Sequence, residues 1–191
     1  MGLIFKVSKK ELLTVRKNIF LEKGLPELEK QGFQKAPFKT SWFGWNGGIQ
    51  CYIFQLGRIV DHSMFQSLNI YIHRDDRWIQ IYLNIFELSP PIETIEQLKA
   101  SNGINFGIPP ASLTTMRLRA HGNKGIPLLN AIFSPDYKLR ASFSERGFEQ
   151  KVEKLRKLIA SDMKAIDEFI AQWHEIFEIN TTDWDGNRLS I

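Results

Sequence analysis

The residues best suited to acid–base or metal chemistry are the four histidines. Asp61-His62 comes closest to an acid–base pair, but neighbouring side chains on an extended strand point in opposite directions and orient each other poorly. No histidine stands at a metal-ligand spacing from another histidine or from Cys51, the single cysteine. The sequence therefore predicts no metal site and no cofactor. It favours a non-enzymatic protein over a small enzyme that would use His62 or His73 as its acid or base.

A basic segment at residues 117–124 provides the groups that would bind an anion. Arg117 and Arg119 point the same way if the chain there is extended, and two guanidinium groups side by side form a fork for phosphate or carboxylate. Lys124 adds a third cation to the candidate site. The competing interpretation, which we favour, is a charged edge strand that keeps the sheets of two molecules from pairing.

The strongest candidate for a binding surface is a hairpin predicted from residues 68–74 and 77–86. With Asp75 and Asp76 as a two-residue turn, Ile70 faces Ile81 and Leu68 faces Leu83, so one face of the hairpin is aliphatic. The other face is aromatic and polar, as expected of a sheet surface that touches solvent or a ligand. The candidate binding residues on it are Asn69, Tyr71, His73, Trp78, Gln80 and Tyr82. Such a face can receive a peptide or a small ligand or stack on bases, unless further strands, loops or a dimer mate cover it.

Helical patterns stand at the two ends of the chain. Ser8 and Glu11 form a capping box ahead of an apolar stripe, and Gly24 is expected to end that helix. Residues 148–177 carry apolar side chains at steps of three or four, which predicts a long helix, with a division expected at Ser161-Asp162. Thr94 and Gln97 form a second capping box before a short helix.

Strand patterns fill the region between these helices. Asn46-Gly47 separates two aromatic strands and is a strong hairpin signal, and Gly57 is expected to end the second of them. Weaker strands are predicted at residues 33–36, 113–120, 128–133 and 137–143, with a turn at 122–125. Together the patterns predict an α+β fold, in which an antiparallel β-meander sheet has the N-terminal helix and the long C-terminal helix packed on one face. We expect residues 1–179 to form a single domain and residues 180–191 a polar tail.

The order of these features resembles an uncharacterised bacterial family, the domain of unknown function DUF4304. The carrying residues run from 12 to 86 and comprise a helix ending in 28–35, then an aromatic strand, then the segment 48–55 and a strand at 68–72; the helix at 162–173 would match the closing helix of the family. They cover about half of the chain, and residues 109–143 match nothing in the family. The motifs are structural rather than chemical, so the resemblance implies a fold and no activity.

Charge and composition narrow the function classes only modestly. A net charge of +4 and a pI near 9.2 permit an acidic partner or a phosphate backbone but demand neither. The N-terminal residues show no signal-peptide pattern, and no apolar stretch is long enough to span a membrane, so we expect a cytoplasmic protein without membrane contact. The leading hypothesis is an interaction domain that binds a protein partner or a second copy of itself through the polar-aromatic face. Nucleic-acid binding by the same face with help from Arg117, Arg119 and Lys124 is the alternative, and a small enzyme is the third.

Overall fold

The computed structural model describes residues 5–104, 111–119, 136–140 and 142–189. The helices are α1 (Lys9–Ile19), α2 (Leu25–Lys30), α4 (Glu145–Lys164) and α5 (Ile166–Ile176), the π-helical turn η1 (Phe20–Gly24) and the 3-10 helices η2 (Ile95–Ala100) and η3 (Ala111–Leu113). The strands are β1 (Gln34–Lys35), β2 (Phe43–Asn46), β3 (Cys51–Val60), β4 (Met64–His73), β5 (Gln80–Leu88), β6 (Met116–Arg117) and β7 (Asn180–Thr182). The strands predicted at 128–133 and the turn at 122–125 lie outside the described residues.

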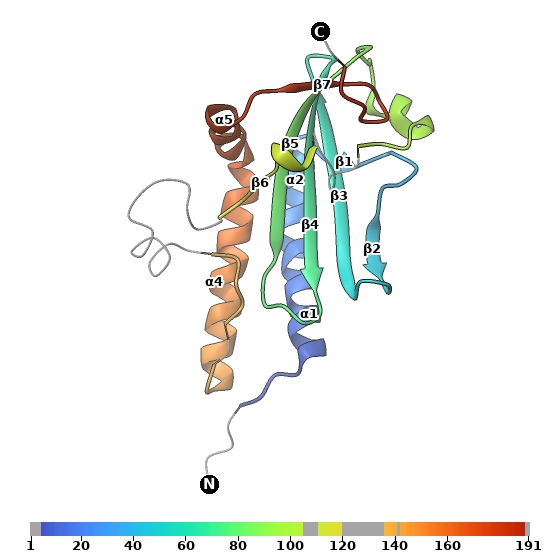
Figure 1. The fold of residues 1–191 in the computed structure, drawn as a ribbon. Coiled ribbons are helices and arrows are strands. Elements are labelled where there is room, and N and C mark those ends of the chain that lie inside the picture. Colours follow the sequence, from blue (N-terminus) through green and yellow to red (C-terminus); the bar gives the residue numbers. More distant parts are fainter. Residues whose placement is uncertain (1–4, 105–110, 120–135, 141, 190–191) are drawn as a thin grey trace.

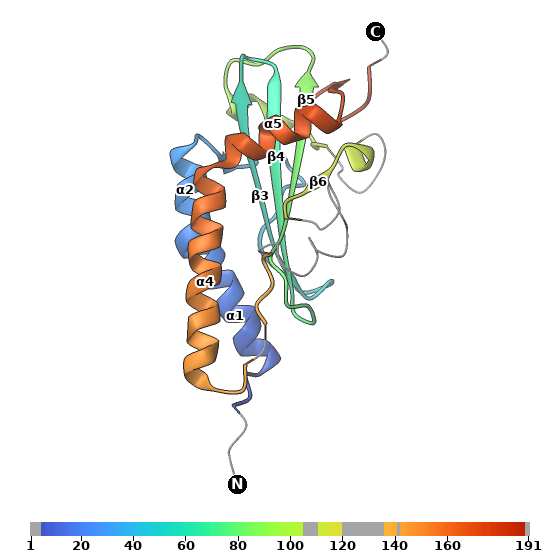
Figure 2. The same ribbon diagram turned by 90° about the vertical axis from the view of Figure 1, so that its left-hand side faces the viewer.

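The strands form one open sheet, with α1, α2 and α4 on one side of it (Figures 1 and 2). Its strand order is β1-β3-β4-β5-β6, with β2 also pairing with β3 and β7 pairing with β5. All pairs are antiparallel except β5–β7, which is parallel. Figure 2 shows α1, α2 and α4 as a layer against one face, which confirms the predicted α+β architecture. We call the opposite face, toward the viewer in Figure 1, the outer face.

The β4–β5 hairpin has the predicted register. The pairs are Leu68–Leu83, Asn69–Tyr82, Ile70–Ile81 and Tyr71–Gln80. The aliphatic side of the hairpin is fully buried and packs with α4 and α5 in the main core. Because side chains alternate along a strand, the polar and aromatic residues are then fixed on the outer face.

The hairpin loop is wider than predicted. The two-residue turn at Asp75-Asp76 is wrong, because β4 ends at His73 and β5 begins only at Gln80. Residues 77–79 pair instead with residues 137–139, with the Ile79 N–H donating to the Tyr137 carbonyl at 3.0 Å. The strands β4 and β5 therefore separate next to their connecting loop, and residues 137–139 pair with the chain there.

A second, smaller core covers one end of the outer face. Phe65 and Phe86 are fully buried there beneath side chains from the segment that follows β5 and from η2. The expected polar tail is partly wrong, since Asn180–Thr182 forms β7 along this end of the sheet and Thr182 is fully buried. Among the described residues, the side chains of this second core do not reach the other end of the outer face, where the β4–β5 loop lies.

The structure confirms the helix predictions that rest on a few neighbouring residues. Ser8 and Glu11 form the predicted capping box, with the Ser8 N–H donating to the Glu11 carboxylate at 2.8 Å. The long C-terminal helix divides at Ala165, a few residues after the predicted point. Gly24 does not end the first helix, because the chain continues through η1 into α2. A Cβ at Gly24 would lie 2.9 Å from the Phe20 ring, so this glycine serves close packing.

Gly57 likewise does not end its strand. β3 runs through it to Val60, and the Phe65 ring of β4 lies where a Gly57 side chain would be, 2.4 Å from an ideal Cβ. The glycine thus makes room for a large buried ring on the neighbouring strand. The hairpin at Asn46-Gly47 forms with the looser turn 47–50, and the Asn46 carboxamide oxygen accepts the Gly48 N–H at 3.0 Å.

Candidate functional site

Five of the six candidate binding residues lie at the open end of the outer face. We call them the aromatic patch, which consists of Tyr71, His73, Trp78, Gln80 and Tyr82. All five side chains are half-buried. They come from β4, β5 and the loop between these strands, so the sheet register itself assembles them.

The rings of the aromatic patch support one another. Tyr71 meets Tyr82 edge to face with ring centroids 5.9 Å apart, and it stacks on His73 at 6.3 Å. The Tyr82 hydroxyl donates to the Gln80 side-chain oxygen at 2.9 Å, and the Gln80 amide donates to Asp76 at 2.7 Å. Burial raises the pKa of the Tyr71 hydroxyl above its ordinary value, so the ring stays neutral at physiological pH. The patch is therefore a preformed surface.

Asn69, the sixth candidate, has a structural role instead. It is 2% exposed, its side-chain oxygen accepts from Gln55 at 2.9 Å, and its amide donates to Ser67 at 3.3 Å. Buried amides are stable only when their hydrogen bonds are satisfied in this way. Asn69 therefore lies beneath the surface that a ligand would touch.

Two cations lie against Trp78. The Arg117 guanidinium carbon and the Lys138 ammonium nitrogen are each 5.1 Å from the Trp78 ring centroid. Arg117 comes from β6 and Lys138 from an isolated bridge to Trp78. A cation–π contact does not neutralise the cation, so Arg117 and Lys138 bring positive charge to the patch. Within the described chain, neither cation forms an ion pair with an acidic residue.

The predicted Arg117–Arg119 fork does not form. β6 ends at Arg117, and Arg119 has a left-handed backbone with φ of 55°. Its guanidinium makes a two-point contact with Asp162 of α4, at 2.8 and 2.6 Å, and the Tyr137 hydroxyl donates to the same carboxylate at 2.7 Å. The hydrogen bond to Asp162 raises the pKa of Arg119. Lys124, the third predicted cation, lies outside the described residues.

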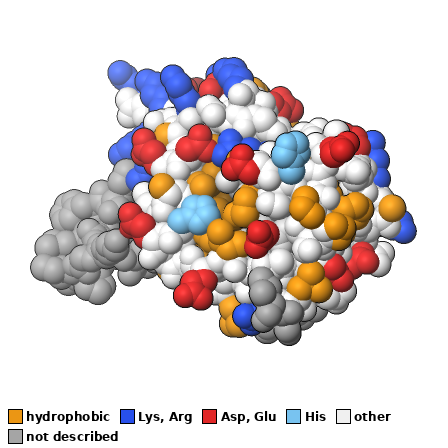
Figure 3. All heavy atoms as spheres, turned by 90° about the horizontal axis from the view of Figure 1, so that it is seen from above, with side chains coloured by type: hydrophobic (Ala, Val, Ile, Leu, Met, Phe, Trp, Pro, Cys, Tyr) orange, Lys and Arg blue, Asp and Glu red, His pale blue; other side chains and the backbone are white. Residues whose placement is uncertain are grey.

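The described histidines, His62, His73 and His174, belong to three separate elements of the fold. His62 is in the β3–β4 turn, and it lines a pocket of about 420 Å³ with Asp61, Glu93 and Glu96. His73 is part of the aromatic patch, and neither His62 nor His73 hydrogen-bonds to a described carboxylate. His121 lies outside the described residues. No group of three or more described His, Cys, Asp or Glu side chains is arranged to hold a metal ion. Seen from above the view of Figure 1, the surface of the molecule carries acidic and hydrophobic side chains intermixed (Figure 3).

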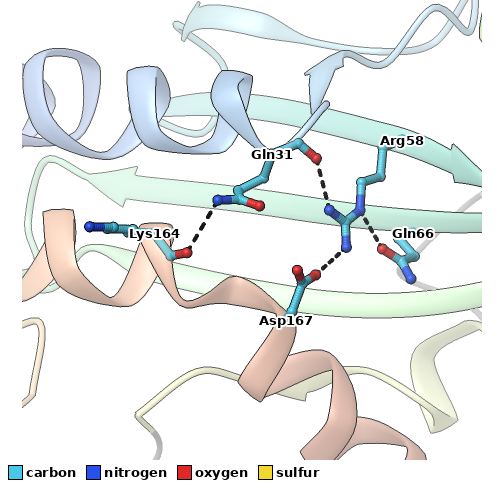
Figure 4. Close-up of polar contacts among 5 residues, drawn as sticks. All are labelled: Gln31, Arg58, Gln66, Lys164 and Asp167. Atoms are coloured by element: carbon cyan, nitrogen blue, oxygen red, sulfur yellow. Dashed lines mark hydrogen bonds and ion pairs between the residues drawn. The ribbon is translucent and has the colours of Figure 1, made fainter.

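A polar cluster around Arg58 is also structural (Figure 4). The guanidinium donates to the Gln66 side chain at 2.6 Å and to the Gln31 carbonyl at 2.8 Å, and it forms an ion pair with Asp167. It also lies over the Phe33 ring at 4.7 Å. All three nitrogens of Arg58 thus contact the protein, and the cluster joins α2, the sheet and α5.

Arg16, which the sequence did not single out, holds the loop that carries the patch. It is fully buried in α1, and its guanidinium donates to the carbonyls of His73 at 2.9 Å and Trp78 at 2.8 Å. Burial lowers the pKa of Arg16 to about 10, so the side chain keeps its charge at neutral pH. Arg16 lies four residues after Leu12 and three before Ile19, on the apolar stripe of the predicted helix. This spacing is the sequence feature that could have indicated its burial.

Comparisons of the chain with protein-family models, with curated proteins and with solved structures find no match in any of the three. The resemblance to DUF4304 therefore stays a prediction. Among the described residues, no helix is both long and apolar enough to cross a membrane.

Proposed function

We propose that the protein is a non-enzymatic binding domain whose aromatic patch receives an acidic segment of a partner protein. The observation that carries the proposal is the pair of cations, Arg117 and Lys138, which lie against Trp78 without a described acidic partner. Tyrosine, tryptophan and arginine are the residues enriched at surfaces that bind proteins. A carboxylate from a partner would supply the missing counter-charge.

The rest of the patch suits a peptide better than a reacting substrate. Tyr71, His73 and Tyr82 give a half-buried aromatic surface, and the Gln80 side chain offers polar atoms between them. No described base–nucleophile pair accompanies them. A binding role therefore needs only the groups that are present.

Nucleic-acid binding is the second candidate, favoured by the same two cations, which lie next to aromatic rings and have no acidic partner among the described residues. The contacts around Trp78 weigh against it, because Arg117 and Lys138 occupy ring surface on which a base would stack. The two functions differ in their response to nuclease and to salt.

The test is affinity capture from a lysate of the source cells with immobilised protein. The double variant Arg117→Glu/Lys138→Glu is compared with the wild type and with Lys23→Glu/Lys154→Glu, which changes the net charge equally at exposed positions of the helical layer. A protein that survives nuclease treatment and is retained by the wild type and the control, but not by the patch variant, supports the proposal. Retention that disappears with nuclease favours the second candidate. Equal capture by all three forms contradicts both.

A further inference from the structure

A groove of about 650 Å³ lies between α1 and the first half of α4, on the helical layer and away from the aromatic patch. Its apolar lining consists of Phe5, Val7, Val15, Phe148 and Val152. Phe148 is buried, whereas the other four are only partly buried where they pack against the main core. The groove therefore leaves apolar surface in contact with water, which is a feature of binding sites.

Glutamates form the rim of this groove. Glu145, Glu149 and Glu153 recur every fourth residue and so lie in a row along α4, and Glu11 faces them from α1. Glu11 is engaged by its capping box, and Glu153 has a cation, Lys157, only at 3.8 Å. Glu145 and Glu149 are exposed and have no ion pair with a described cation.

The positive charge at the groove does not balance these acids. Lys6 and Arg156 are the basic residues that line it, and Arg156 is already paired with Glu22. The groove is thus locally acidic on a chain whose net charge is +4. A basic partner would be attracted to it, and an acidic one would be repelled.

We propose that this groove binds an amphipathic helix of a partner protein, with its apolar stripe on the groove floor and its lysines or arginines toward the glutamate rim. The groove is bordered by α1 with residues 5–7 ahead of it and by α4, and none of its described lining residues belongs to a β-strand, so it offers side-chain contacts and no strand edge. The row from Glu145 to Glu153 is about 12 Å long at 1.5 Å per residue, which matches about two turns of a bound helix. This surface is independent of the proposed role of the aromatic patch.

The probe for the test is a fluorescein-labelled Leu/Lys peptide of about 14 residues, with leucines at three-and-four spacing. Its control replaces every lysine with glutamate. Binding to the full chain is measured by fluorescence anisotropy at about 0.15 M salt. We expect saturable binding of the lysine peptide and none of the glutamate peptide.

Two variants localise the binding. Glu145→Lys/Glu149→Lys should weaken it roughly tenfold, because each reversal replaces an attraction with a repulsion. Glu93→Lys/Glu96→Lys is the matched control, since it changes the net charge equally at exposed positions outside the groove. Val152→Gln should also weaken binding, by removing apolar contact from the floor.

Four results would overturn the proposal. They are equal binding of the two peptides, no binding of the lysine peptide, equal losses in the two charge-reversed variants, and a dimer of this chain that Glu145→Lys/Glu149→Lys dissociates. The last result would assign the groove to a second copy. None of them bears on capture by Arg117 and Lys138, so the two proposals fail separately.

Discussion

Replacing Arg16 with methionine should destabilise the protein and loosen the β4–β5 loop. Methionine keeps the length and apolar stem of the side chain but removes the guanidinium, which donates to the carbonyls of Leu12, His73 and Trp78 at 3.1, 2.9 and 2.8 Å. The His73 and Trp78 carbonyls stand at the splayed end of the hairpin, where the strands do not pair with each other. They would lose these donors in the variant.

The expected size of the effect follows from two opposing contributions. Hydrogen bonds from a charged donor contribute about 1.5–3 kcal/mol each, so two loop carbonyls give about 3–6 kcal/mol. The variant also no longer buries a charge, and because desolvating an ion costs several kcal/mol, this offsets part of the lost stability. We therefore expect Arg16→Met to lower the free energy of unfolding by roughly 2–4 kcal/mol.

The assay is urea unfolding followed by circular dichroism and tryptophan fluorescence. Lys10→Met is the matched control, since it removes a cation from the same helix at an exposed position, and we expect a change within about 0.5 kcal/mol. Arg16→Lys should recover little stability, because one ammonium group lacks the fork that reaches two carbonyls. If Arg16→Met unfolds at the same urea concentration as Lys10→Met, the guanidinium does not hold the loop and the reasoning is refuted.

Three further predictions concern single groups. Gly57→Ala should cost about 1–3 kcal/mol because its Cβ would meet the Phe65 ring at 2.4 Å, whereas Gly47→Ala, with its nearest contact at 3.8 Å, should be nearly neutral in the same urea assay. Burial raises the pKa of the Cys51 thiol to about 11, so a thiol reagent at pH 8 should label it slowly until urea is added; rapid labelling of the folded protein would contradict this. Burial raises the pKa of Tyr137 well above its ordinary value, so the unfolded chain ionises first and stability should fall as pH rises above about 10. Tyr137→Phe should flatten that fall, and an unchanged pH profile would count against it.

Local patterns were predictable because they depend on a few neighbouring residues. The Ser8–Glu11 capping box needs only a spacing of three, and the pairing of Leu68 with Leu83 needs only alternation around a turn. The predicted face of the hairpin survived the wrong turn, because widening a loop evenly on both sides leaves the register of the strands unchanged.

Contacts between distant segments were not predictable from one sequence. Arg119 and Asp162 are 43 residues apart, and nothing near either one indicates the other. The predicted fork failed for this reason, since a buried carboxylate on α4 attracts Arg119 more strongly than an exposed strand position would hold it. Lys138 was missed similarly, because its place beside Trp78 depends on a backbone bridge between the two segments.

The geometry of the aromatic patch depends on a residue from the opposite side of the sheet. Arg16 belongs to the helical layer, yet its two loop contacts fix the backbone at His73 and at Trp78, the two patch residues that flank the loop. A sheet face normally takes its shape from its own strands, but here the strands have separated before they reach these residues. Holding the gap open allows residues 137–139 to enter and bring Lys138 to Trp78. A narrow turn would pair residues 77–79 with β4 and leave no place for residues 137–139, so the hydrogen bonds of Arg16 favour the loop shape in which Lys138 joins Arg117 beside Trp78.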